Sequence, residues 1–359
     1  MTTQKQLAEM AGVSAGTVSN VITGSIRVSD RTRKKVLDAI RALDYHPNLI
    51  ARSLKTNRTN TLGIVIPEIT NPFFPKLIRG AQLAARENGY FLIVLDTDEN
   101  EVLELELISM LQSQRVDGIL LVSSAGKWRE DTISTPISLG PPIVCVDRMP
   151  EGLDVDTVRV ESRAAAEMGV SHLLSMGHRE IAIITGPLSL KHERERLSGY
   201  RCALHKAGIE VRNSLLWAST FNESEIDIAC RKGLQKKKGK PSALFTTNGF
   251  VALNALRSIY AAGIGTPEDI AFVTIDEIAA ADFFRPAITA VVQPVFEMGY
   301  RAVEILLERI KKGAKMGAPK REQLSPKLLV RASSDFVFQS RPTKAHIQRG
   351  ISHLRSKAR

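Results

Sequence analysis

The stretch TQKQLAEMAGVSAGTVSNVI, residues 3–22, decides the fold of the amino-terminal part of the chain. Thr3 is followed three residues later by Gln6, which is a capping box and predicts a helix that starts at residue 4. Gly12 supplies a backbone conformation that ends this helix, and Ser14 caps a second one. Because so few residues separate the two helices, the pattern predicts a helix-turn-helix.

The second helix should present small and polar side chains outward, because its valines are spaced to pack against the first helix. These outer residues are predicted to face DNA: Ala15, Gly16, Thr17, Ser19 and Asn20. A third helix capped by Ser29 would complete a domain over residues 1–46. Caps and apolar stripes alone are common to small helical domains. However, residues 1–58 contain ten basic and four acidic residues, and this net charge of +6 suits a phosphate backbone.

A connector over residues 47–60 follows this domain. Pro47 disfavours helix at the residue before it, and Asn48 can cap a new helix of under two turns. So short a helix is not stable alone in water, because nucleation costs more than the few hydrogen bonds return. The connector therefore either folds on a binding partner or is a plain interdomain linker.

Residues 61–339 alternate short apolar runs with helical patterns, which is typical of parallel sheets covered by helices. The runs predicted to be strands are residues 62–67, 91–96, 118–123, 143–147, 181–186, 243–247 and 270–276. The predicted helices include residues 76–88, 102–112, 163–176, 194–206, 250–261 and 295–311. This is an α/β pattern, and in such sheets ligands bind beyond the carboxyl ends of the strands.

Several short motifs run through both parts of the chain: LAEMAGVS (7–14), TVSNV (17–21), YHPN (45–48), ARSLK (51–55), GIVIP (63–67), NPFF (71–74), GYR (199–201) and PEDIA (267–271). With these motifs the chain resembles the lactose/galactose repressor family of bacterial transcription regulators. The resemblance implies a three-helix DNA-binding domain with a hinge helix, then a two-lobed core like that of periplasmic binding proteins. Lobe 1 is expected at about 61–160 and 291–323, lobe 2 at about 161–290 and 324–339, and a disordered basic tail at 340–359.

The resemblance also implies how DNA is bound. A homodimer would place its two heads in successive major-groove half-sites of a near-palindromic operator. Further contacts with DNA are expected from the cap residue Thr3, from the basic Arg27, and from five residues at the family's motif positions: Ser14, Asn48, Ala51, Leu54 and Lys55. Leu54 would wedge into the minor groove. Ala15 and Gly16 stand where family members commonly carry bulky polar side chains, so we expect few direct base contacts and a larger contribution from DNA shape.

Candidate ligand-binding residues come at the ends of the predicted strands: Phe73, Phe74, Asp147, Arg148, Asn248 and Asp276. By resemblance, Arg196 and Phe221 join them. Aromatic faces stack on sugar rings or bases, and carboxylate, amide and guanidinium groups bind hydroxyls. Taken singly, any of these residues could instead be a loop-end packing or capping residue. A sugar or sugar derivative is the expected effector, with nucleobases left open, because Gly249 and Glu277 depart from residues that many family members carry.

Other function classes find less support in the sequence. There is no P-loop, dinucleotide fingerprint, zinc-ligand spacing or nucleophile motif, so we expect no enzyme, cofactor or metal site. No apolar run reaches membrane-spanning length and no secretory signal is evident, so we expect a cytoplasmic, nucleoid-associated protein. Two alternatives remain: a solute-binding protein of the periplasmic type, and a DNA-architectural protein without ligand control.

Overall fold

The computed structural model describes residues 3–23, 28–45, 58–128, 140–235, 239–278, 281–313 and 317–335. The chain divides into two compact units, Met1–Thr59 and Asn60–Arg359. Each unit has its own hydrophobic core, so each is described by itself.

The first unit contains the predicted helices α1 (Gln4–Ala11), α2 (Ala15–Thr23) and α3 (Asp30–Ala42). The capping box is confirmed, since the Gln6 backbone N–H donates to the Thr3 hydroxyl and the Gln6 side chain accepts from the Thr3 N–H. Gly12 ends α1 with a φ of 64°, and the Ser14 hydroxyl accepts from the Thr17 N–H at 3.1 Å. Fully buried Leu7, Val18 and Val36 join the three helices into one small core.

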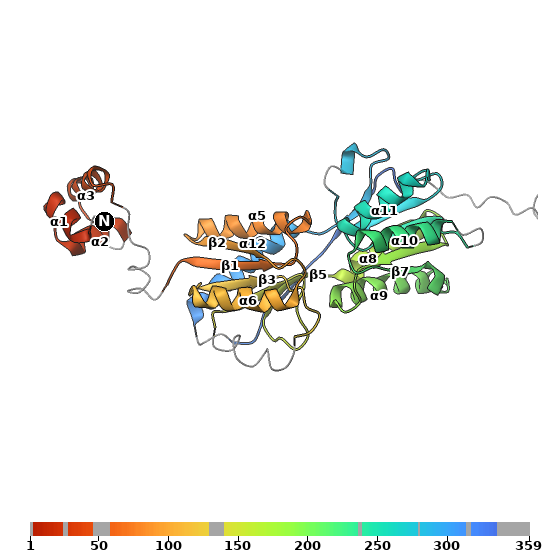
Figure 1. The fold of residues 1–359 in the computed structure, drawn as a ribbon, viewed down its shortest axis with the longest axis horizontal. Coiled ribbons are helices and arrows are strands. Elements are labelled where there is room, and N and C mark those ends of the chain that lie inside the picture. The colour runs from red at the N-terminus through yellow and green to blue at the C-terminus, as the bar shows by residue number, and fades with distance from the viewer. Residues whose placement is uncertain are drawn as a thin grey trace, which may run out of the picture. The chain divides into compact units, whose positions relative to one another are not determined.

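The second unit consists of two lobes, each built on a six-stranded sheet (Figure 1). The lobe 1 sheet has the order β11-β5-β4-β3-β1-β2. Its strands, all paired in parallel, are β1 (Thr61–Ile66), β2 (Phe91–Asp96), β3 (Gly118–Leu121), β4 (Ile143–Val146), β5 (Asp156–Val160) and β11 (Arg321–Leu324). Helices α5 (Phe73–Glu87) and α12 (Val295–Lys312) cover one face, and α6 (Glu101–Ser113) covers the other.

The lobe 2 sheet repeats this layout with the order β12-β10-β9-β8-β6-β7. Its strands are β6 (Ile181–Thr185), β7 (Leu216–Ala218), β8 (Ala243–Thr246), β9 (Ala271–Ile275), β10 (Thr289–Val292) and β12 (Lys327–Leu329). Only the β10–β12 pair is antiparallel. Helices α8 (Ser162–Ser175) and α9 (Lys191–Lys206) pack on one face, and α10 (Glu223–Leu234) and α11 (Gly249–Ala261) on the other.

These two sheets confirm the predicted α/β class, and the chain passes between the lobes three times within the described residues. The passages follow β5, β10 and β11, after residues 160, 292 and 324. Three strands therefore lead directly from one lobe into the other. The sequence pattern did not predict β5, β7, β10, β11, β12 or α10. It predicted that α9 starts at residue 194, three residues after its observed start.

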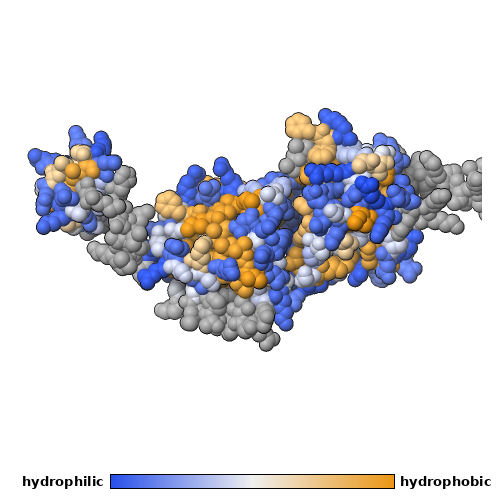
Figure 2. All heavy atoms as spheres, viewed as in Figure 1, coloured by the Kyte–Doolittle hydropathy of each residue, from blue (hydrophilic) through white to orange (hydrophobic). Residues whose placement is uncertain are grey.

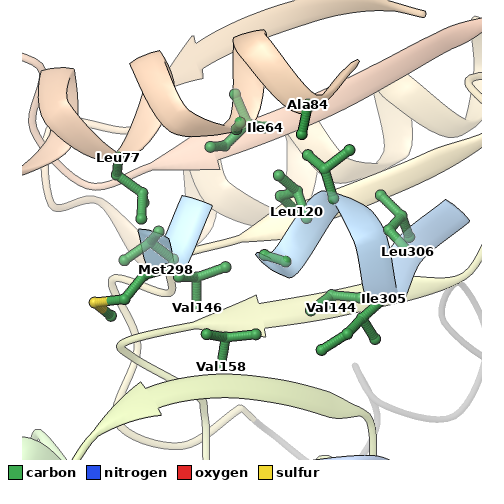
Figure 3. Close-up of a cluster of buried hydrophobic side chains, with 14 of the residues drawn as sticks. Ile64, Leu77, Ala84, Leu120, Val144, Val146, Val158, Met298, Ile305 and Leu306 are labelled. Carbon is green, nitrogen blue, oxygen red and sulfur yellow. The ribbon is translucent and has the colours of Figure 1, made fainter. Parts of the chain in front are cut away.

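The core of lobe 1 lies between its sheet and the helix pair α5 and α12, where apolar side chains from both layers interlock (Figure 3). Residues that line this core from the strands are Ile64, Leu120, Val144, Val146 and Val158, and those from the helices are Leu77, Ala84, Met298, Ile305 and Leu306. The alternate side chains of these strands point to the other face, where α6 covers them, so both faces are buried and the strands are visible in the sequence as continuous apolar runs.

Two glycines allow α5 and α12 to approach closely. A Cβ on Gly80 would lie 1.9 Å from the Phe296 carbonyl oxygen, and one on Gly299 would lie 2.1 Å from that of Leu77. Both contacts are with backbone, so a larger residue could not be accommodated by a change of rotamer. The two glycines therefore set the distance between the helices.

Replacing Gly80 with Ala should lower the free energy of unfolding of the second unit by about 1–3 kcal/mol, because the added methyl group forces the two helices apart. In an unobstructed helix the same change stabilises by about 0.5–1 kcal/mol. Denaturant unfolding measures the difference, and an unchanged or raised stability would contradict the close contact. Gly16→Ala, whose Cβ would meet only the Ser14 hydroxyl oxygen at 3.6 Å, gives the effect of the same change at an uncrowded helix position, measured on the first unit.

Candidate functional site

In the first unit, the outer side of α2 carries the predicted DNA-facing residues. Ala15 and Gly16 are exposed, and Thr17, Ser19 and Asn20 are partly exposed, while Val18 is fully buried. The Thr17 and Ser14 hydroxyls are hydrogen-bonded to each other at 2.9 Å. Thr3 and Ser14 are exposed helix caps. Arg27, Asn48, Ala51, Leu54 and Lys55 lie outside the described residues.

In the second unit, two aspartates occupy matching positions at the ends of central strands. Asp147 follows β4 with a φ of 60°, and Asp276 follows β9 with a φ of 70°. Each backbone N–H donates to the neighbouring strand, at Val158 O and Val291 O respectively. Residues other than glycine adopt this left-handed conformation rarely, and such residues cluster at binding sites. The repeated geometry marks the facing carboxyl ends of both sheets as one site.

Arg196 lies in the second turn of α9 and is 3% exposed. Its Nη1 donates to Glu193 Oε1 at 3.1 Å and to the Thr247 carbonyl at 3.0 Å. Glu193 is fully buried and also accepts from the Gly186 N–H at 2.9 Å. Burial opposes the charge on Arg196, but the carboxylates of Glu193, Asp147 and Asp276 outweigh it and raise the pKa of the guanidinium.

The charge of Arg196 influences the pKa of two neighbouring groups, His192 and Asp276. Burial, followed by the charge of Arg196, lowers the pKa of His192 well below its ordinary value, so the imidazole is neutral. Burial also raises the pKa of Asp276, an effect that Asp147 reinforces and Arg196 opposes. Gln293 Nε2 donates to Asp276 Oδ1 at 2.6 Å and fixes the position of that carboxylate.

Arg148 belongs to lobe 1 but reaches lobe 2. Its guanidinium carbon is 5.7 Å from the ring centre of Phe74 and 5.5 Å from that of Phe221, which lies in lobe 2. Its Nη1 donates to both carboxylate oxygens of Glu99 at 2.9 Å. Phe74 is 1% exposed and edge-on to Phe73, so its ring is part of the lobe 1 core as well as a wall of the site.

The lobes also contact each other through ion pairs beside this site. Arg159 of β5 donates to Glu195 of α9 at 2.8 Å, and Arg194 pairs with Glu151. Lys76 of lobe 1 and Glu277 of lobe 2 form a third pair, with Lys76 Nζ 3.8 Å from Glu277 Oε2. The lobes are therefore held against each other around the site.

A cavity of about 550 Å³ opens between the amino-terminal ends of α5 and α11. Phe73, Asp276 and Gln293 line it, and it extends past Gly249 to the start of α12. Asn248 lies next to it, but its side-chain oxygen caps α11 by accepting from the Val251 N–H at 2.9 Å. The volume falls in the range of small-molecule sites.

Several buried polar atoms around the site lack a hydrogen-bond partner within the described residues. They are Nε of Arg148, Nε of Arg196, Oγ1 of Thr247 and Oε1 of Gln293. A buried polar atom without a partner costs about 1–3 kcal/mol, so such atoms are rare in the absence of a ligand or water. Two of these four atoms are donors, one is an acceptor, and the Thr247 hydroxyl can be either. This mixture suits a molecule rich in hydroxyl groups.

The structure thus brings together Asp147, Arg148, Arg196, Phe74, Phe221 and Asp276, with Phe73 and Asn248 at the border. The sequence reading missed Glu99, Glu193 and Gln293. Glu193 had a usable signal, since it precedes Arg196 by one helical turn, but the predicted helix began after it. Glu99 and Gln293 come from loops and had none.

Comparison with known proteins decides the assignment. Residues 3–48 match the family model "Bacterial regulatory proteins, lacI family", and residues 59–332 match "Periplasmic binding proteins and sugar binding domain of LacI family". The chain belongs to the LacI family. This LacI family protein is therefore a DNA-binding transcription regulator, as its motifs predicted. No described helix is long and apolar enough to cross a membrane.

Individual relatives cover almost the whole chain. The ribose operon repressor of Escherichia coli K12 is 34% identical and aligns with 93% of this chain and 100% of its own length. The repressor PurR of Photobacterium profundum is also 34% identical, over 93% and 98% of the two chains. Among solved structures, a transcriptional regulator CelR–cellobiose complex is 33% identical, with a TM-score of 0.68 and coverage of 93% and 100%. A lac repressor dimer bound to operator shares the fold, with a TM-score of 0.80 at 23% identity over 93% and 99%.

Proposed function

We propose that this LacI family protein is a repressor whose affinity for a near-palindromic operator is controlled by a small polyhydroxylated effector. The effector binds between the lobes, in contact with Asp147, Arg148, Arg196 and Asp276. The supporting observation is the set of buried polar atoms without partners at the facing strand ends, beside a cavity of suitable size. A solved relative is a cellobiose complex, and another, 25% identical, contains bound ribose.

The effector acts by preferring one arrangement of the lobes. A ligand shifts an equilibrium only by its difference in affinity for the two states. Here Arg148 of lobe 1 contacts Phe221 of lobe 2, so any ligand that moves Arg148 also alters a contact between the lobes. We propose that this change reaches the DNA-binding domain through the hinge of residues 47–60, with Leu54 as the minor-groove wedge.

Operator binding requires two heads, and the β2 edge of lobe 1 offers a surface for a second copy. Phe91 is 69% exposed, and Ile93, Val94 and Val102 are also exposed. Figure 2 shows an apolar patch over this edge of the sheet. A strand edge with exposed apolar side chains would promote aggregation if left uncovered, and a symmetric homodimer covers it.

In the first unit, we propose that α2 enters the major groove. Its outer side carries only small or polar groups, of which Asn20 suits adenine and Ala15 suits a thymine methyl group. The other contacts are to phosphates, and the net positive charge of residues 1–58 supplies them.

To test this proposal, the melting temperature of the full-length protein is measured in the presence of sugars, sugar acids and nucleobases. A true effector at a hundredfold excess over its Kd should stabilise the second unit by about 2.7 kcal/mol. The same compound should change the affinity for operator DNA, while a compound without a thermal effect should not.

Salt dependence is the control for the DNA contact. Operator affinity should fall steeply as salt rises, because each phosphate contact releases counterions. If DNA binds but no compound alters either the melting temperature or the DNA affinity, the protein is a DNA-architectural protein and the proposal of ligand control is wrong. If no duplex binds at any salt concentration, the proposal of operator binding is also wrong.

A further inference from the structure

Three largely buried arginines around the cleft are each paired with a glutamate. Arg148 is paired with Glu99, Arg196 with Glu193, and Arg159 with Glu195. The arginine side chains are 7%, 3% and 13% exposed, so these pairs are partly or wholly withdrawn from water. Each guanidinium is therefore neutralised before any ligand enters.

Beyond these pairs, the charges at the strand ends are negative. The two cations that line the adjoining cavity, Lys76 and Arg257, are themselves paired with Glu277 and Glu223. Asp147 and Asp276 share the charge of Arg196 with Glu193, and within the described residues neither aspartate forms an ion pair with an arginine of its own. His192 is neutral, because burial and the surrounding arginines lower its pKa. The three pairs cancel, which leaves these two carboxylates as the excess. A phosphate or carboxylate ligand would be repelled by them, and in a water-poor site this repulsion is stronger than on a surface. A hydroxyl group, by contrast, can donate to a carboxylate and accept from an arginine Nε.

Glu99 is the member of these pairs with the most unusual backbone. It has a φ of 54° and follows Asp98, whose φ is 51°. Two successive non-glycine residues in this region are energetically unfavourable, and such strain persists only where the surrounding structure enforces it. The Glu99 N–H donates to the Pro67 carbonyl at 2.8 Å, which ties this turn to the end of β1.

This turn places the carboxylate of Glu99 against one end of the Arg148 guanidinium. Both carboxylate oxygens accept from the same Nη1, while Nε has no partner in the described parts of the chain. Phe74 and Phe221 lie on the guanidinium. The charge of the guanidinium is thus balanced by Glu99, while its Nε–H remains available as a donor to a ligand.

We propose that Glu99 determines the charge class of the effector: by neutralising Arg148 it makes the cleft accept an uncharged polyhydroxylated molecule and reject its phosphorylated or acidic derivative. This inference rests on the proposed function of the cleft. The inference narrows the class of effector to neutral sugars and excludes sugar acids and sugar phosphates. The sequence did not distinguish between these classes.

The test uses the full-length protein and matched probes: ribose with ribose 5-phosphate, glucose with glucose 6-phosphate and gluconate, and cellobiose. Native mass spectrometry of the protein in an equimolar mixture reads the mass of whatever is retained, and melting temperatures rank the affinities. The wild type should retain a neutral sugar and none of the anions. Retention of an anion in preference to its neutral partner overturns the inference but leaves the proposed effector function intact. If neither class is retained, the proposed effector function fails, and the inference fails with it.

Glu99→Gln keeps the shape of the side chain but releases the charge of Arg148. The ratio of anionic to neutral affinity should rise by about tenfold or more, as expected for one unit of charge. Glu99→Asp keeps the charge and should retain the preference for the neutral probe. Glu101→Gln removes a negative charge two residues away that is exposed to solvent, and it should behave like the wild type. If Glu99→Gln and Glu101→Gln give the same ratio, Glu99 does not set the charge class. Operator binding by each variant verifies that it is folded.

Discussion

Replacing Arg196 with Met should abolish the response to effector and lower the free energy of unfolding of the second unit by about 3–5 kcal/mol. Glu193 is fully buried, and Arg196 is the side chain to which its Oε1 is hydrogen-bonded. Removing the arginine therefore leaves a buried carboxylate without its counter-ion, as well as removing a donor from the cleft. Denaturant unfolding measures the stability, and the thermal shift with ligand measures the response.

A second substitution separates these two effects. Adding Glu193→Gln to Arg196→Met removes the uncompensated charge, so much of the lost stability should return. The ligand response should stay absent, because Nε of Arg196 is still missing. If the double variant responds to effector like the wild type, Arg196 does not contact the ligand.

Replacing Arg309 with Met should be similarly destabilising, by about 3–5 kcal/mol, but without a direct effect on the cleft. Arg309 in α12 donates through Nε and Nη2 to the two carboxylate oxygens of Asp156, both at 2.6 Å. The two side chains are 6% and 5% exposed. Asp156 also accepts from the Lys320 N–H, so this single carboxylate joins α12, β5 and the segment before β11.

Lys312→Met is the matched control for this prediction. Lys312 lies on the same helix and is 3.8 Å from Glu308, but the two side chains are 53% and 47% exposed. Exposed pairs of this kind contribute less than about 1 kcal/mol, so the control should unfold almost like the wild type. Equal losses for both variants would show that burial of the Arg309 pair is not what makes it important.

The sequence predicted best where one local pattern was sufficient. The caps of α1 and α3 were correct because the capping side chains lie within three residues of the groups they bind. The central strands were found because both faces are covered, which requires a continuous apolar run. Strand β5 was not named, since Asp156 and Arg159 interrupt its apolar pattern and have partners remote in sequence.

The site could be predicted only in part for the same reason. Asp147, Arg148 and Asp276 could be placed at strand ends because these strands are predictable from the sequence. Their partners Glu99 and Gln293 come from other loops, and nothing local connects them. Glu277, one of the departures from the family pattern, pairs with Arg331 at 2.6 Å and approaches Lys76, so it serves contacts around the cleft.

The matching positions of Asp147 and Asp276 have a consequence for how the cleft works when empty. Each lobe holds one carboxylate toward the same interior space, and these like charges repel each other. This repulsion works against the ion pairs that hold the lobes together, so without ligand we expect the cleft to open part of the time. In the effector complex that we propose, a molecule with hydroxyl groups on both sides would remove this penalty by donating to both aspartates at once, and the lobes would then stay closed.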